Sequence, residues 1–177
     1  ANLDSPRDIE YATASFGQGI AVTPIAISRA LATLGNGGRL VTPHIAKELR
    51  FMDGTVQPIT YPEGEQVFEP ETSEEISRML TAVVDDALRG GAVKLDDYTI
   101  AAKTGTAQIA DRENGGYYDD RFLHSFFGYF PAYDPEFLVF LYTVEPKNVR
   151  YASETLTDPF MDVTEFLINY YSIPPDR

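Results

Sequence analysis

Four consecutive residues, Lys103, Thr104, Gly105 and Thr106, place a cation, two hydroxyls and a glycine in one short segment. They follow the apolar stretch 98–102, which is typical of a β-strand. A cation and two hydroxyls on one strand edge can hold the anionic end of a peptide. The glycine lets a ligand backbone approach closely because it has no Cβ. The KTGT segment (residues 103–106) therefore predicts an anion-binding site at a strand edge.

The serines decide whether the chain can perform acyl transfer, the chemistry in which a Lys-Thr-Gly triplet accompanies a serine nucleophile. That chemistry also needs a Ser-x-x-Lys nucleophile and a Ser-x-Asn or Ser-Asp-Asn loop. No serine has lysine three positions later or asparagine two positions later; the serines are Ser5, Ser15, Ser28, Ser73, Ser77, Ser125, Ser153 and Ser172. Because a nucleophile must lie next to a base, we expect this chain alone to be inactive.

The composition indicates one folded domain with an acidic surface. The chain has 177 residues, of which 44% are hydrophobic, enough for a real core. Lys and Arg number 14 against 27 Asp and Glu, which gives a net charge of −13. Such a charge repels nucleic acid and anionic lipid headgroups, so we expect neither as a partner. The acidic loops are interpreted as solvated surface.

Cysteine is absent, which excludes disulfides, cysteine metal sites and thiol catalysis. The only histidines, His44 and His124, cannot form a histidine-rich metal site, and we expect each to be structural. We expect no metal and no cofactor. No run of about 18 apolar residues predicts a membrane span. The first residues do not resemble a signal peptide, and we interpret them as a boundary inside a longer protein.

Three helices are predicted from apolar residues at helical spacing and from capping signals. The first has Thr23 as N-cap and Pro24 at its first position. The second has a capping box at Thr72 and Glu75, and the third is capped by Asp158 and starts at Pro159. Their apolar stripes are Ile27, Ala30, Leu31 and Leu34; Ile76, Met79, Leu80, Val83, Val84 and Ala87; and Phe160, Val163, Leu167 and Tyr170.

Five strand-like runs alternate with turn signals. Residues 45–51 and 56–59 flank Asp53-Gly54, a favoured hairpin turn. Runs at 98–108, 123–130 and 137–144 follow, with a polar loop at 111–120. Their short polar connections predict an antiparallel three-stranded meander packed with helices, an α+β fold. The last run is apolar at nearly every position, so we expect both its faces to be covered, but no further strand is evident for its outer edge.

The chain resembles the C-terminal part of the transpeptidase domain of class B penicillin-binding proteins, which cross-link the bacterial cell wall. Four stretches carry the resemblance: 15–24 resembles a Gly-x-Gly loop before a helix, 34–38 the end of that helix, 102–108 the third catalytic motif, and 125–146 the next two strands. Residues 152–159 depart from the family, which is usually rich in glycine and alanine there. The family's central sheet has five strands, so the resemblance implies that residues 137–144 pair with a strand that precedes this chain.

The resemblance also implies roles for the KTGT segment. Lys103 would hydrogen-bond the hydroxyl of the Ser-x-Asn motif and help to move protons. The Thr104 and Thr106 hydroxyls would hold the terminal carboxylate of the substrate or of a β-lactam, and Gly105 would keep the strand surface open. The backbone N–H of Thr106 would be one of two oxyanion-hole donors. Lys103 and Thr106 are thus the candidate catalytic residues, and Thr104, Gly105 and Thr106 the candidate substrate-binding residues.

The leading hypothesis is therefore part of a serine-type peptidoglycan D,D-transpeptidase, with residues 1–177 as the C-terminal portion of one penicillin-binding domain. The implied partners are a D-Ala-D-Ala stem peptide, β-lactams and the missing N-terminal portion of the domain. The parent is expected to be membrane-anchored and to act outside the cytoplasmic membrane, in the periplasm or on its outer face. Two alternatives remain: a fragment of a serine β-lactamase or β-lactam sensor, and a non-catalytic module that binds protein through its strand edge.

Overall fold

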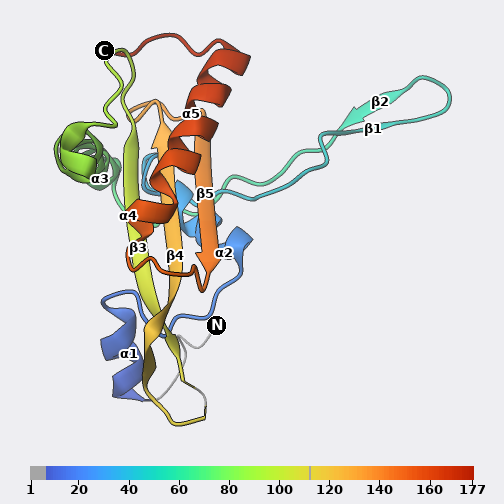
Figure 1. Ribbon diagram of the computed structural model, residues 1–177. Helices are drawn as coiled ribbons and strands as arrows, with labels where there is room; N and C mark the ends of the chain where they lie inside the picture. Colours follow the sequence, from blue (N-terminus) through green and yellow to red (C-terminus); the bar gives the residue numbers. More distant parts are fainter. Residues whose placement is uncertain (1–6, 112) are drawn as a thin grey trace.

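A three-stranded antiparallel sheet forms the centre of the computed structural model, which describes residues 7–111 and 113–177 (Figure 1). Its strands are β3 (Ala101–Ala110), β4 (Tyr117–Phe130) and β5 (Phe137–Val144), in that spatial order. The register pairs Lys103 with Phe127 and Phe127 with Phe140. The expected antiparallel meander of an α+β fold is confirmed.

Helix α5 (Thr157–Tyr171) covers one face of this sheet (Figure 1). Phe160 of α5 stacks on Phe126 of β4 with ring centroids 4.3 Å apart. Alternate residues of β4 turn toward the helix because side chains of a strand alternate between faces. The buried core on this side comprises Val84, Leu88, Ile100, Ala102, Phe126, Phe130, Leu156, Phe160, Met161, Ile168 and Ile173.

The opposite face is covered only at one end. A small cluster there contains Ala101, Tyr129 and Ala132, with Leu34 and Leu80 packed against it. Helix α2 (Pro24–Ala32) has no buried residue. A two-stranded hairpin of β1 (Glu48–Arg50) and β2 (Val56–Pro58) extends away from the body as an arm (Figure 1). This arm is the predicted hairpin, with shorter strands than expected.

The helix boundaries differ from two predictions. Thr23 accepts a hydrogen bond from the Ala26 amide at 3.3 Å, so the first predicted N-cap is confirmed. The predicted capping box at Thr72 and Glu75 is wrong, because α3 (Pro70–Ala82) already begins at Pro70. The expected cap at Asp158 is also wrong, because α5 begins at Thr157. Pro70 occupies the first position of α3, which proline favours, whereas Pro159 lies in the first turn of α5 after Thr157 and Asp158.

The predicted apolar stripes are only partly buried. Met79 of α3 and Tyr170 of α5 are exposed, and Leu34 lies beyond the end of α2. The buried side chains of α3 are instead Ser73, Ser77 and Thr81. Small hydroxyl residues let this helix approach its neighbours closely, and Ser73 donates to the Leu34 carbonyl at 2.7 Å. Beyond α3 the chain continues through a π-helical turn, η2 (Val83–Ala87), and a 3₁₀ turn, η3 (Leu88–Gly91).

Four further differences concern the strands and the N-terminal region. Strand β3 starts at Ala101 instead of residue 98, and β4 begins at Tyr117, inside the expected polar loop. A short helix, α1 (Asp8–Ala14), lies in the region that had seemed only polar. The expectation that both faces of β5 are covered is wrong for this chain, because Tyr142 and Val144 are exposed.

Candidate active site

The KTGT segment lies within β3, an edge strand of the sheet. Among the residues described, no strand pairs with the outer edge of β3. An edge strand presents unpaired N–H and C=O groups to an extended peptide. The segment is therefore placed where a peptide ligand can add as a further strand.

The two threonines of the segment share the face covered by α5. Thr104 pairs with Phe126 and Thr106 with His124, and both partners are fully buried on that face. Thr104 itself is half-buried, and Thr106 is exposed. The Thr106 hydroxyl oxygen accepts a hydrogen bond from the Ala152 amide at 3.0 Å. The hydroxyls thus lie at the rim of the packed face, where the edge strand leaves them accessible.

Lys103 lies on the other face of β3 and is exposed. Its Nζ donates to the Thr104 carbonyl oxygen at 2.9 Å, which bends the side chain back over its own strand. Within the described part of the chain, Lys103 has no carboxylate within ion-pair distance. Its ammonium therefore has donors left for a hydroxyl or an anion.

Gly105 lies close to the neighbouring strand. A Cβ at this position would lie 2.5 Å from the hydroxyl oxygen of Ser125 on the neighbouring strand. No other atom would come closer than 3.9 Å. The missing side chain therefore makes room for Ser125 in the sheet, beside any room that it leaves for a ligand. The expectation that Gly105 keeps the strand surface open for a ligand stays a prediction.

Two hollows of the described residues both lie away from the KTGT segment. A hollow of about 570 Å³ is lined by residues at the base of the arm, including Arg39, His44 and Tyr61. A second hollow of about 520 Å³ lies beside Arg121 and Glu145. The KTGT residues line neither of them. A ligand held here needs a second wall that faces β3.

Among the described residues, no group of three or more His, Asp or Glu side chains is arranged to hold a metal ion. His44 is exposed, stacks on Tyr61 with ring centroids 3.7 Å apart, and bonds to the Thr42 carbonyl. His124 is buried with both ring nitrogens in hydrogen bonds. The prediction of structural histidines is confirmed for His124. No helix of the described chain is long and apolar enough to cross a membrane.

A family model of the penicillin-binding protein transpeptidase domain matches residues 1–164 of this chain. The chain belongs to the penicillin-binding transpeptidase family. The match includes the KTGT segment and all three strands of the sheet. The family recognised from the sequence motifs is thus confirmed.

Known members of the transpeptidase family are similar along most of the chain. Stage V sporulation protein D of Bacillus subtilis is 34% identical over 163 residues, which cover 90% of this chain and 24% of that protein. A peptidoglycan D,D-transpeptidase FtsI homolog of Mesostigma viride is 32% identical over 182 residues, covering 95% and 30%. The chain therefore spans less than a third of these relatives.

Solved structures of transpeptidases share the fold. Penicillin-binding protein 3 of Mycobacterium tuberculosis superimposes with a TM-score of 0.79 at 24% identity, over 94% of this chain and 39% of that one. The transpeptidase domain of penicillin-binding protein 3 from Burkholderia pseudomallei gives 0.70 at 26% identity, over 97% and 49%. The Mycobacterium tuberculosis protein has also been solved in complex with ampicillin.

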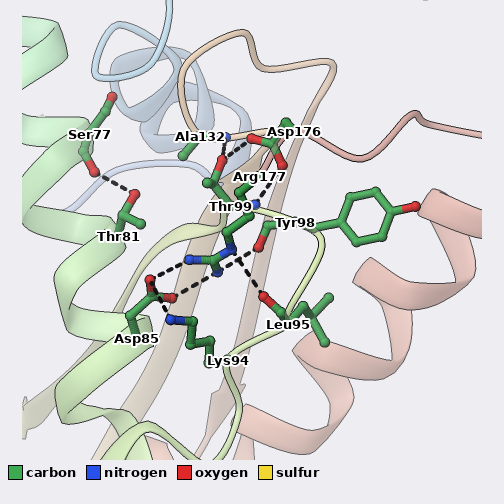
Figure 2. A network of polar contacts seen from close by, with 10 residues as sticks. All are labelled: Ser77, Thr81, Asp85, Lys94, Leu95, Tyr98, Thr99, Ala132, Asp176 and Arg177. Carbon is green, nitrogen blue, oxygen red and sulfur yellow. Dashed lines mark hydrogen bonds and ion pairs between the residues drawn. The ribbon is translucent and has the colours of Figure 1, made fainter.

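Residues beyond the matched range hold the start of β3 in this transpeptidase chain. Asp176 accepts a hydrogen bond from the Thr99 amide at 2.7 Å and another from the Thr99 hydroxyl (Figure 2). Arg177 donates to Asp85 at 2.9 Å and to the Tyr98 carbonyl at 2.6 Å. These contacts join the last two residues of the chain to η2 and to the residues that lead into β3. They hold the strand in place four residues before Lys103.

Sequence reasoning missed these supporting residues of the transpeptidase fold. Asp176 and Arg177 follow a double proline and carry no motif. Their partners lie 77 and 92 positions away along the chain. His124 was expected to be structural, but its partners Thr155 and Arg150 were not identified. No signal in the sequence joins such distant positions.

Proposed function

We propose that residues 1–177 are the C-terminal portion of a single transpeptidase domain in a peptidoglycan D,D-transpeptidase. The observation that carries the proposal is the KTGT segment on a free strand edge in a chain of this family. The chain covers only 24% of the length of stage V sporulation protein D and 30% of the length of the FtsI homolog. It also has no Ser-x-x-Lys. The nucleophile would therefore come from the N-terminal portion of the same domain, which would also supply the second wall.

Each residue of the KTGT segment has a proposed task. The exposed ammonium of Lys103 would bind a serine hydroxyl of the N-terminal portion and help to move a proton. The Thr104 and Thr106 hydroxyls would donate to the terminal carboxylate of the stem peptide. The Thr106 N–H would bind the developing oxyanion, and losing one such donor typically costs about 3–4 kcal/mol of transition-state stabilisation. Gly105 would keep the strand surface open for the ligand.

The proposed reaction is acyl transfer in two steps. The serine oxygen attacks the carbonyl carbon between the two D-Ala residues, the peptide bond breaks, and the leaving amine of the terminal D-Ala takes up a proton. A neighbouring amine then attacks the resulting ester, the ester bond breaks, and a proton returns to the serine oxygen. A β-lactam would acylate the same serine by opening of its ring. No cofactor is needed, because every proton and bond is accounted for by these groups.

The proposed substrate also sets where the protein acts. Peptidoglycan stem peptides with D-Ala-D-Ala ends are cross-linked outside the cytoplasmic membrane, so we place this domain there, in a membrane-anchored parent. The net charge of −13 gives no attraction to nucleic acid or to anionic lipid surfaces. The strand edge of β3 is the proposed contact for the peptide, by addition of a strand.

Labelling with a fluorescent penicillin tests the proposal. The longer protein that contains this chain should form a stable covalent adduct, and the 177-residue chain alone should form none. Substitution Lys103→Ala in the longer protein should abolish labelling. The matched control is Lys47→Ala, because Lys47 is an exposed lysine next to the arm, and this variant should label as the wild type does.

Other outcomes distinguish the alternatives. An adduct that is rapidly hydrolysed, with turnover of penicillin, would indicate a β-lactamase. A longer protein without Ser-x-x-Lys that binds no penicillin would indicate a non-catalytic module. Stable labelling of the 177-residue chain would contradict the absence of a nucleophile from it.

A further inference from the structure

Three hydrogen bonds tie the segment around helix α4 (Ala152–Thr155) to the KTGT segment and to its neighbouring strand. The Ala152 amide donates to the Thr106 hydroxyl oxygen at 3.0 Å. One ring nitrogen of His124, Nδ1, lies 2.8 Å from the Thr155 hydroxyl oxygen, and the other, Nε2, lies 2.9 Å from the Arg150 carbonyl. Thr106 and His124 are directly paired across β3 and β4. The three contacts therefore form one connected unit.

The partners of His124 determine where its proton lies. A backbone carbonyl only accepts hydrogen bonds, so the Nε2 that faces Arg150 must carry hydrogen. The ring is completely buried, with no carboxylate among its hydrogen-bond partners. Nδ1 faces the Thr155 hydroxyl, and that hydroxyl also donates to the Ala152 carbonyl at 3.3 Å. The Thr155 hydroxyl thus joins His124 of β4 to Ala152, the first residue of α4.

The Thr106 hydroxyl is oriented by the same unit. A hydroxyl has one hydrogen to donate and two lone pairs that accept. The Ala152 amide occupies one lone pair, and no acceptor for the Thr106 hydrogen lies among the described residues. Because the side chain is exposed at the edge strand, this hydrogen is left for a ligand. The position of Ala152 thus decides which way Thr106 donates.

We propose that His124 and Thr155 are positioning residues that hold Ala152 against Thr106, so that the Thr106 hydroxyl donates to the carboxylate of the peptide or β-lactam. Neither residue touches the ligand. The inference rests on the proposed function and adds to it a pair of residues that no motif of the chain marks. It also gives a task to α4, which packs beside β3 (Figure 1).

The test compares two substitutions at Thr155 in the longer protein, with the second-order rate constant for acylation by fluorescent penicillin as the readout. Thr155→Val has nearly the same shape but no hydroxyl, and should slow acylation about tenfold, the effect of weakening one hydrogen bond to an anion. Thr155→Ser keeps the hydroxyl and should acylate at nearly the wild-type rate. Thr155→Ala removes the same hydroxyl with a smaller side chain and serves if the valine variant does not fold.

A double substitution separates positioning from a general loss of stability. Thr106→Val removes the hydroxyl that is being positioned, so Thr106→Val with Thr155→Val should be no slower than Thr106→Val alone. The proposal would be overturned if the double variant were slowed by the product of the two single fold-reductions in acylation rate. It would also be overturned if Thr155→Val acylated as fast as the wild type. If the wild-type protein itself fails to label, the proposed function fails before this inference is reached.

Discussion

The two faces of the β3–β4–β5 sheet differ in how completely this chain covers them. On the α5 face, Phe126, Gly128 and Phe130 of β4 are buried, and the Phe160 ring stacks on Phe126 and lies against Gly128. On the other face, Ser125 and Phe127 are half-buried, and Tyr142 of β5 is 51% exposed. Both faces carry aromatic residues, so the difference lies in what is packed on them. The covered face holds the strands in place, and the open face is the one we propose the rest of the domain to cover.

The largest expected effect is the loss of the ring that covers the packed face. Phe160→Ala should lower the free energy of unfolding by about 3–5 kcal/mol, because it removes a fully buried ring and leaves a cavity. Phe140→Ala, on a half-buried residue of the open face, is the matched control and should cost clearly less. Urea unfolding followed by circular dichroism measures both. Equal losses would mean that the two faces are packed alike.

The second prediction concerns the two glycines of the sheet. A Cβ at Gly128 would lie 2.4 Å from the Phe160 ring, 2.7 Å from the Ala102 Cβ and 3.0 Å from the Ala101 carbonyl oxygen. Gly128→Ala should therefore destabilise the fold by about 1–3 kcal/mol, since backbone and ring must both move.

Gly105→Ala is the control for this steric effect on the open face. Its Cβ would meet only the Ser125 hydroxyl at 2.5 Å, and that hydroxyl can rotate away. The substitution should cost less than about 1 kcal/mol in thermal unfolding. A larger loss of stability for Gly105→Ala than for Gly128→Ala would contradict the conclusion that the α5 face is the more tightly packed one.

A smaller effect depends on pH and on the start of α5. Arg89 donates hydrogen bonds to Asp158, which lowers the pKa of that carboxyl below its usual value. A lowered pKa stabilises the fold above the unfolded pKa of about 3.9, and this contribution is lost as the pH falls through the folded pKa. Asp158→Asn should thus be slightly less stable than the wild type at pH 6 and equally stable near pH 2. The difference is small because the pair is exposed.

Thermal unfolding across this pH range measures the Asp158 effect. Glu165→Gln is the control, because Glu165 is exposed and no ion pair is formed by its side chain in the described structure. At pH 6, Glu165→Gln should differ less from the wild type than Asp158→Asn does. A gap for Asp158→Asn that persists at pH 2 would show that the carboxylate does not act through its charge.

The smallest effect is expected on the open face. Tyr142→Ser should change the stability of the 177-residue chain by less than about 0.5 kcal/mol, because the side chain has little packing to lose. In the longer protein the same substitution should cost more, if the rest of the domain covers this face. Differential scanning calorimetry of both proteins measures this. Equal small effects in the two proteins would show that the rest of the domain does not cover this face.

The sequence predicted the parts of the fold that local patterns encode. Alternating and apolar runs placed β4 and β5, and a turn dipeptide placed the arm. Thr23 and Pro24 marked the start of α2 correctly. The start of α3 was missed, because Thr72 and Glu75 match the capping-box pattern inside a helix that begins at Pro70. The length of β4 was missed because its first residues, Tyr117 and Tyr118 followed by two aspartates, read as a loop until they pair with β3.

The sequence by itself determined the family, the KTGT segment and the absence of a Ser-x-x-Lys nucleophile, because residue types at short spacing define all three. Only the tertiary structure decided what supports that segment. Asp176 with Thr99, His124 with Thr155, and Ala152 with Thr106 lie between 31 and 77 positions apart. Hydrogen bonds act over about 3 Å, so such pairs exist only after the sheet and helices have brought distant segments together.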